Sequence, residues 1–275
     1  MGNLWKGFKE HGTFRFTSLL VILLIALVVL APVIAPYNPL EAVMKDANQA
    51  PSMAHLFGTD KLGRDVLSRI LYGGAYSLSS VLALVVIIFC VGTFLGLVAG
   101  YFGGLIDTVI MRIADMMISF PGVILAIAIA GIMGGSLVNA MIALTAVTWT
   151  KYARLSRSMV LKIRKRDFVD AAIVSGGTSS HILWTHIMPN VVPILVITAV
   201  SDIGAMMMEL AGLSFLGFGS QPPAPEWGLM LNEGRQQLQT APWLMVFPGL
   251  AIFISVVIFN LWGDALRDVL DPRDQ

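Results

Sequence analysis

The stretch DAAIVSGGTSSHILWTHIMPN, residues 170–190, interrupts an otherwise apolar chain where a positively charged segment ends and a new apolar segment begins. It is too polar to enter lipid and too short to form a domain, so another surface has to cover it. Ile182, Leu183 and Ile187 recur in it at helical spacing and predict an apolar stripe. Four small residues predict that the covering surface approaches the backbone closely: Ala171, Ala172, Gly176 and Gly177.

The middle of this stretch, Gly-Gly-Thr-Ser-Ser, predicts a turn between two short helices. Ser179 or Ser180 is the expected N-cap of the second helix, because a serine hydroxyl accepts a hydrogen bond from the first turn. Pro189 fits the first turn of the following helix, where its missing N–H costs little.

The composition is that of a membrane protein. Of 275 residues, 56% are hydrophobic and only 13% are charged, against about 25% charged in soluble domains. The formal net charge of +1 gives no support for nucleic-acid binding. The single cysteine, Cys90, excludes an internal disulfide, and its apolar surroundings in the sequence predict a buried, inert thiol.

Six apolar stretches are long enough to cross a bilayer, which takes about 20 residues of helix. They are Thr17–Ala35, Ser77–Gly100, Leu105–Met133, Leu137–Ser158, Val191–Leu213 and Trp243–Leu266. The first follows Lys6, Lys9 and Arg15, as a signal peptide would, but its length exceeds the roughly 7–15 apolar residues of a cleaved signal. We therefore predict an all-α integral membrane protein with six transmembrane helices.

Loop charge predicts the orientation of these helices. Residues 151–166 carry seven Lys and Arg residues and no acid, which places this loop in the cytoplasm. Six spans then put both termini in the cytoplasm and residues 36–76 and 214–242 outside. Attraction of a solvated basic helix face to anionic lipid is the alternative explanation of the cluster.

The order Asp170-Ala171-Ala172, three residues, Gly176, nine residues, His186-Ile187-Met188-Pro189 resembles the E-A-A-x3-G-x9-I-x-L-P signature of permease subunits in ABC importers. The chain departs from the signature in having Asp170 for Glu, His186 for Ile and Met188 for Leu. The resemblance implies that this loop forms coupling helices that dock on an ATP-binding subunit. An amphipathic connector without a docking partner is the alternative.

Further strings resemble the dipeptide, oligopeptide and nickel branch of these importers: GTDKLGRDVLSRILYG at residues 58–73, SFLGFGSQPPAPEWG at residues 214–228 and GDALRDVLDPR at residues 263–273. Two others, SDIGAMMMELAGLSFLG from residue 201 and NEGRQ from residue 232, are closer to the nickel branch. In the first string, Leu62, Val66 and Ile70 predict an amphipathic helix at the membrane interface, with Asp65 and Arg69 spaced for a local salt bridge. The proline-rich QPPAPEWG predicts a stiff extended loop, with its tryptophan suited to the membrane interface.

The resemblance implies a type I ABC importer permease fold. Its parts are residues 1–73 with the first helix and an outer amphipathic segment, residues 74–266 with the transmembrane domain and its coupling loop 151–190, and the cytoplasmic tail 267–275. The implied partners are a second permease, two ATP-binding subunits that hold ATP and Mg²⁺, and an extracytoplasmic substrate-binding protein. The implied location is the cytoplasmic membrane of a bacterium or archaeon, and the mechanism is alternating access.

Two acids in the fifth span are candidates for the translocation path. Asp202 and Glu209 are seven residues apart and fall on nearly one helix face, and ionisable groups within a membrane usually face protein or a water-filled cavity. Pairing with Arg112 or with the partner permease is the alternative. Met206, in the run that precedes Glu209, has a thioether suited to a soft metal ion, although such methionines more often serve packing. The closer resemblance of residues 201–217 and 232–236 to the nickel branch implies nickel, carried as a chelate, as the cargo, with small peptides as the alternative.

The sequence contains no phosphate-binding loop, because none of its lysines follows a glycine. The patterns H-E-x-x-H, C-x-x-C and G-x-S-x-G are also missing from it. We therefore predict no catalytic or metal-ligating residues, no cofactor and no enzymatic activity for this chain. Two other classes of protein compete with this interpretation: a secondary transporter, and a membrane-bound scaffold or enzyme. Neither class requires a docking loop of small residues.

Overall fold

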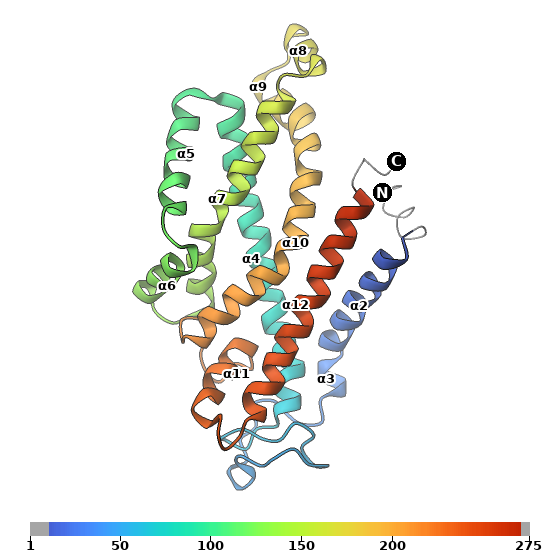
Figure 1. Cartoon of the computed structure of the whole chain (residues 1–275), viewed down its shortest axis with the longest axis vertical. Helices are drawn as coiled ribbons and strands as arrows, with labels where there is room; N and C mark the ends of the chain where they lie inside the picture. The colour runs from blue at the N-terminus through green and yellow to red at the C-terminus, as the bar shows by residue number, and fades with distance from the viewer. Residues whose placement is uncertain (1–10, 271–275) are drawn as a thin grey trace. The chain divides into compact units, whose positions relative to one another are not determined.

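The computed structural model describes residues 11–270, which fold into helices joined by loops (Figure 1). This confirms the all-α class. The α-helices are α2 (Gly12–Val29), α3 (Ala31–Ile34), α4 (Val66–Phe102), α5 (Gly104–Ile118), α6 (Gly122–Met133), α7 (Leu137–Ile163), α8 (Asp167–Val174), α9 (Ser179–Ile182), α10 (Met188–Phe215), α11 (Trp227–Gly234) and α12 (Trp243–Leu270). Single turns of other types lie at Met44–Asp46, Leu183–Ile187 and Arg235–Gln237. Lys6, Lys9 and the end of the predicted tail lie outside the described residues.

The count of six spans is not confirmed. Four helical segments in the described range are long and apolar enough to cross a membrane: α2, α4, residues 179–215 and α12. The predicted third span is two helices, α5 and α6, bent by 93° at a short break, and it makes a fifth candidate if the pair is one span. The predicted fourth span corresponds to α7, which is long enough, but Asn139, Lys151 and Arg154 fall within its first 18 residues and lower its hydropathy.

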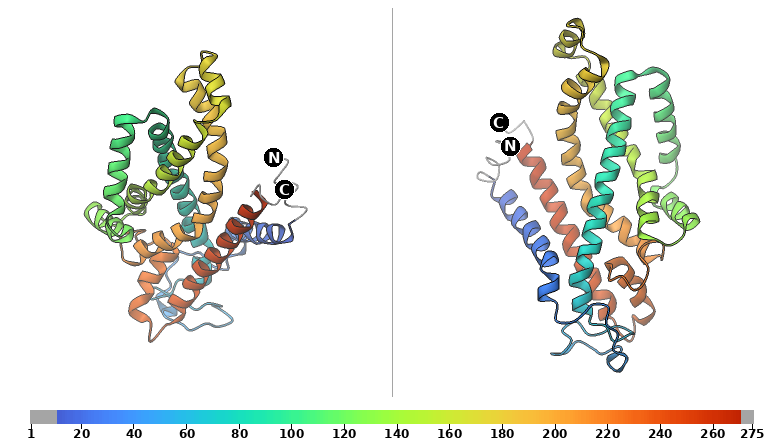
Figure 2. Two further views of the ribbon diagram at one scale, coloured as in Figure 1. Left: turned by 45° about the horizontal axis from the view of Figure 1, so that its top comes forward. Right: turned by 180° about the vertical axis from the view of Figure 1, so that it is seen from behind.

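The helices group into two compact units. The first contains the residues up to Ala83, Ala130–Ile142 and the residues from Ser201 onward; the second contains Leu84–Ile129 and Ala143–Val200. In the first unit, α2 runs beside α12 in each view (Figures 1 and 2), and Trp262 Nε1 donates a hydrogen bond to Ser18 Oγ at 3.1 Å. A side chain on Gly263 would place its Cβ 2.8 Å from Ser201 Cα, so α12 and α10 also lie in close contact.

In the second unit, α4 packs on α7 through a row of glycines at four-residue spacing: Gly92, Gly96 and Gly100. A Cβ on Gly96 would lie 2.3 Å from the carbonyl oxygen of Ala153 and 2.7 Å from Ser156 Cβ. Small residues at this spacing let membrane helices approach until their backbones touch. Cys90, on the same helix, is exposed rather than buried as predicted, because it lies on a face that this contact does not cover.

The string at residues 58–73 does not form a separate interfacial helix. Its first part is a loop and its second part is the start of α4, which begins at Val66. Asp65 caps this helix, since its Oδ2 accepts a hydrogen bond from the Ser68 N–H at 2.8 Å, and its Oδ1 lies 3.0 Å from His55 Nδ1. The predicted pairing of Asp65 with Arg69 is therefore wrong, and Arg69 has other partners.

Substituting Gly96 with alanine should destabilise the folded permease, because the new methyl group has no room beside Ala153. We expect the free energy of unfolding to fall by about 1–3 kcal/mol, as for other overpacked sites. The measurement is the thermal unfolding midpoint of the purified protein in detergent.

The matched control is Gly212→Ala in α10, where nothing lies within 4 Å of a new Cβ. That change should leave the midpoint unchanged or raise it, since alanine favours a helix over glycine by up to about 1 kcal/mol. Equal midpoints for the two variants would contradict the proposed glycine contact.

Candidate functional site

The predicted docking stretch folds as two short helices joined by a glycine turn (Figure 1). Gly176 has a φ of +81°, a value that side chains disfavour, and the N–H of Gly177 donates to the carbonyl oxygen of Ala172 at 3.0 Å. Thr178 rather than a serine caps α9, because its hydroxyl accepts a hydrogen bond from the His181 N–H at 3.3 Å. A turn of π-helix at Leu183–Ile187 then leads into α10, whose second residue is Pro189, as predicted.

The predicted apolar stripe of this loop faces the protein's own interior. Ile182, Leu183 and Ile187 are buried, together with Val169 of α8. They form one core cluster with residues from the ends of α4 and α7 and from the start of α10: Leu97, Tyr101, Val160, Val191 and Leu195. The stripe therefore fixes the loop to the second unit and is not available to a partner.

A second set of apolar side chains on the loop points outward, and sequence reasoning missed it. Phe168 is 45% exposed, Ile173 49%, Val174 87% and Trp184 46%. The signal was present in the sequence, since α8 (DFVDAAIV) carries apolar residues on more than the one face that a surface helix has to bury. Exposed apolar side chains gathered on one short loop indicate a contact surface.

The residues taken over from the family signature lie around this outward set. Asp170, Ala171, Gly176 and Pro189 are exposed, whereas Ala172 and His186 are half-buried. The rings of His181 and His186 meet edge to face with centroids 5.7 Å apart. Ile187 is fully buried and belongs to the core cluster of the second unit.

Part of the basic cluster forms specific contacts inside the second unit. Arg157 of α7 pairs with Asp107 of α5, Nη2 to Oδ2 at 2.6 Å, and Arg154 pairs with Asp115. Arg164 Nη1 donates to the carbonyl oxygen of Tyr101 at 2.8 Å. The cluster therefore also fastens α5 and the end of α4 to α7, in addition to any role in orientation.

The candidate path residues all lie in α10. Asp202 and Glu209 are half-buried, and Met206 is 5% exposed. Met207 is also buried and Met208 is 56% exposed, so two of the three sulfur atoms are enclosed by the first unit. Residues 11–270 bring together no group of three His, Cys, Asp or Glu side chains that could hold a metal ion.

Glu226, which the sequence did not single out, caps α11 from a buried position. Its two carboxylate oxygens each accept a backbone hydrogen bond of 2.8 Å, from the N–H groups of Gly228 and Leu229. Burial raises the pKa of this carboxyl, and the two N–H donors partly oppose the rise. Trp227 beside it is buried, and its Nε1 donates to the carbonyl oxygen of Ile70 at 2.9 Å.

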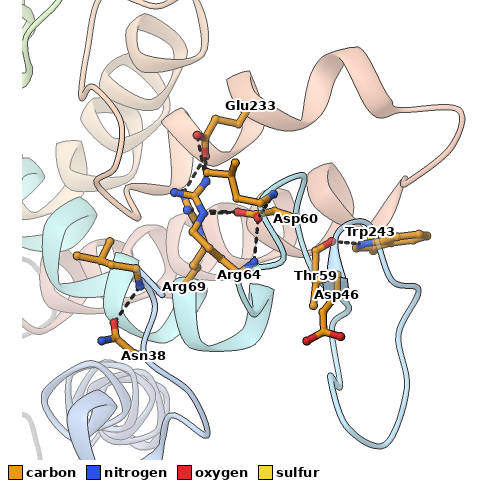
Figure 3. A network of polar contacts seen from close by, with 10 residues as sticks. Asn38, Asp46, Thr59, Asp60, Arg64, Arg69, Glu233 and Trp243 are labelled. Carbon is orange, nitrogen blue, oxygen red and sulfur yellow. Dashed lines mark hydrogen bonds and ion pairs between the residues drawn. The ribbon is translucent and has the colours of Figure 1, made fainter. Parts of the chain in front are cut away.

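Four charged residues form a closed ring in the first unit: Asp60, Arg64, Arg69 and Glu233 (Figure 3). Each arginine contacts both acids. Arg64 Nε lies 2.6 Å from Asp60 and its Nη2 lies 3.2 Å from Glu233. Arg69 Nη2 lies 2.8 Å from Glu233 and its Nη1 lies 3.3 Å from Asp60. We call these four residues the charge clamp.

Two families of known proteins match this chain, and together the matches cover most of its length. Residues 92–273 match the family described as binding-protein-dependent transport system inner membrane component. Residues 1–51 match the N-terminal TM domain of oligopeptide transport permease C. The chain belongs to the binding-protein-dependent transport permeases. It is thus the membrane component of an ABC importer, as the resemblance predicted.

Relatives of this permease with several different cargoes are similar to it at nearly the same level. The glutathione transport system permease protein GsiD of Pectobacterium atrosepticum is 42% identical over 98% of this chain and 90% of its own length. The dipeptide transport system permease protein DppC of Alkalihalophilus pseudofirmus is 42% identical over 98% and 88%. The nickel transport system permease protein NikC of Escherichia coli K12 is 43% identical over 94% and 95%.

A solved structure shares the fold of this permease. It is the inward-facing MetNI methionine ABC transporter, with a TM-score of 0.52 at 19% identity, and the match covers 72% of this chain and 96% of that one. The likeness supports the type I permease fold. The relatives are transport permeases, so the function of this permease lies in its geometry and its contacts rather than in catalysis.

Proposed function

We propose that this permease pairs with a second permease to form a path across the cytoplasmic membrane, and that one of two ATP-binding subunits docks on the loop formed by α8 and α9, while the other docks on the second permease. An extracytoplasmic binding protein delivers the cargo on the opposite side. The basic segment 151–166 supports a cytoplasmic position for this loop. In this arrangement both termini are cytoplasmic, and residues 1–73, 74–266 and 267–275 act as entry segment, transmembrane domain and tail.

The observation that carries the proposal is the division of apolar side chains on the α8–α9 loop. One set, which includes Val169 and Ile187, is buried in the permease, and the other, which includes Val174 and Trp184, is exposed. The first set fastens the loop to α4 and α7, and the second offers an apolar surface that a partner can bury. A connector without a docking partner needs only the first set.

In the proposed cycle, ATP binding brings the ATP-binding subunits together and moves the loop. The path then changes from inward-facing to outward-facing, because the partners contact the permease differently in the two states. The core cluster around Val169 and Ile187 transmits this movement to the ends of α4, α7 and α10. ATP hydrolysis takes place on the partner subunits.

For the cargo, we place small peptides, including glutathione, ahead of nickel. The sulfur atoms of Met206 and Met207 are buried, which weakens the argument for a soft metal ion at this point of α10. The carboxylates of Asp202 and Glu209 suit the ammonium group of a peptide. A nickel chelate with its own ligands remains the second candidate, supported by the similarity to NikC.

Replacing Val174 with aspartate should separate the permease from its ATP-binding subunits. The side chain is 87% exposed, so the change leaves the folded permease intact while it places an unpaired charge in the proposed interface. We expect ATP hydrolysis stimulated by the binding protein to fall at least about tenfold, which corresponds to about 1.4 kcal/mol. Co-purification of the subunits and the ATPase rate are the measurements.

Val174→Ile is the control for this test, because it keeps the apolar character at the same position. It should behave as the wild type. Full ATPase activity and intact association in the aspartate variant would remove the proposed docking surface.

Replacing Asp202 with asparagine, or Glu209 with glutamine, should reduce uptake by at least about tenfold if the carboxylates interact with cargo during passage. The measurement is ATP-driven uptake into proteoliposomes that contain the assembled complex. Glu41→Gln, which removes an exposed acid from the loop before α4, serves as the control. Undiminished uptake in both variants would contradict an interaction of these carboxylates with cargo and would indicate that their role is structural.

Competition for uptake tests the cargo. We expect unlabelled dipeptide or glutathione to suppress uptake of a radiolabelled peptide by the complex with its binding protein, and excess nickel chelate to leave it unchanged. Suppression by the nickel chelate, with labelled nickel accumulating instead, would make nickel the cargo. Uptake that survives without ATP-binding subunits but stops when the ion gradient collapses would identify a secondary transporter.

A further inference from the structure

The charge clamp joins two segments of the first unit that are distant in the sequence, residues 60–69 and α11 (Figure 3). Asp60 and Arg64 belong to the loop before α4, Arg69 lies in the first turn of α4, and Glu233 lies in the last turn of α11. The two arginine side chains are 1% and 2% exposed, and those of Asp60 and Glu233 are 11% and 14% exposed. The two positive and two negative charges therefore balance within an almost dry site.

Other contacts nearby tie these segments to one another and to the neighbouring helices α10 and α12. Trp243 Nε1, at the start of α12, donates to the carbonyl oxygen of Thr59 at 3.2 Å. A side chain on Gly73 of α4 would place its Cβ 2.0 Å from the carbonyl oxygen of Pro225, just before α11. Asn232 Nδ2 of α11 donates to the carbonyl oxygen of Phe215 at 2.5 Å, which connects α11 to the end of α10.

A buried ring of four charges is a costly way to gain stability, because desolvation offsets most of the attraction between the charges. It is an effective way to fix a relative position, since each arginine must meet both acids at once and any displacement leaves a charge unpaired away from water. The ring therefore restricts where α11 can lie against α4 more strongly than apolar contact alone would do.

We propose that Arg69 and Glu233 are positioning residues of transport, which hold α11, the start of α4 and the loop of residues 36–65 together as one rigid element while the rest of the permease changes state. Through Asn232 and Phe215 this element also sets the end of α10, the helix that carries Asp202 and Glu209. The inference rests on the proposed transport cycle.

The direct test is a distance measured by pulsed electron paramagnetic resonance in the assembled complex. Spin labels are placed at Lys45 and Gln236, both exposed, in a Cys90→Ser background, because Cys90 is exposed and would itself be labelled. In the otherwise unchanged complex, the distance distribution should be the same without nucleotide and after trapping with ATP and vanadate. A shift between the two states would overturn the proposal.

Glu233→Gln keeps the shape of the side chain and removes its charge. We expect this variant to broaden the distance distribution, and Glu233→Asp, which keeps the charge, to restore the wild-type mean. If the glutamine variant fails to assemble, Arg64→Lys carries the comparison. It keeps the charge but replaces the guanidinium group that contacts both acids, so it should broaden the distribution as well. Glu41→Gln is the control and should change nothing. Unchanged distributions in every clamp variant would refute the assignment.

The transport readout separates positioning from simple stability. In Glu233→Gln we expect the amount of cargo moved per ATP hydrolysed to fall by at least about threefold, with the ATPase rate within about twofold of wild type. An equal fall in both rates would indicate loss of folded protein and would count against a positioning role. If the wild-type complex shows no ATP-driven uptake, the proposed function fails, while the effect of the clamp variants on the nucleotide-free distance can still be read.

Discussion

The second unit depends on one contact: the buried apolar side chains of the α8–α9 loop pack against the ends of α4 and α7. Ile187 and Val169 lie against Leu97, Tyr101 and Val160, and removing apolar surface of this kind from water gives about 25 cal/mol for each Å². Without this contact the loop would be a polar connector free to move on its own. With it, the loop is packed against α4, α7 and α10.

The glycine row of α4 complements that contact. Because Gly92, Gly96 and Gly100 bring α4 and α7 into backbone contact, the two helices that receive the loop behave as one rigid support. Two ion pairs from α7 to α5 add polar anchors along the same support. Basic residues of the segment 151–166 thus hold helices together within the second unit.

The sequence predicted the helical class, the position of most apolar helices and the permease family, because these depend on long-range composition and on motifs spread over the chain. Pro189 and the glycine turn at Gly176 were also placed correctly, since both depend on local backbone geometry. Periodicity predicted that Ile182, Leu183 and Ile187 share one face, but it did not reveal that this face packs against helices of the same chain. The same limit applies to Arg69, whose partner Glu233 is 164 residues away, and to the buried carboxylate of Glu226. The break between α5 and α6 and the polar residues of α7 left the number of spans unconfirmed.

The electrical neutrality of the charge clamp has a consequence for how this protein can change over evolutionary time. Loss of any one member leaves a surplus charge in a place that water hardly reaches, so single replacements at these four positions should be selected against even where the fold tolerates the new shape. Related chains are then expected to keep the whole set or to exchange it together for neutral residues. The loop that precedes α4 and the helix α11 are distant in the sequence, but their charged residues would then be conserved or replaced together.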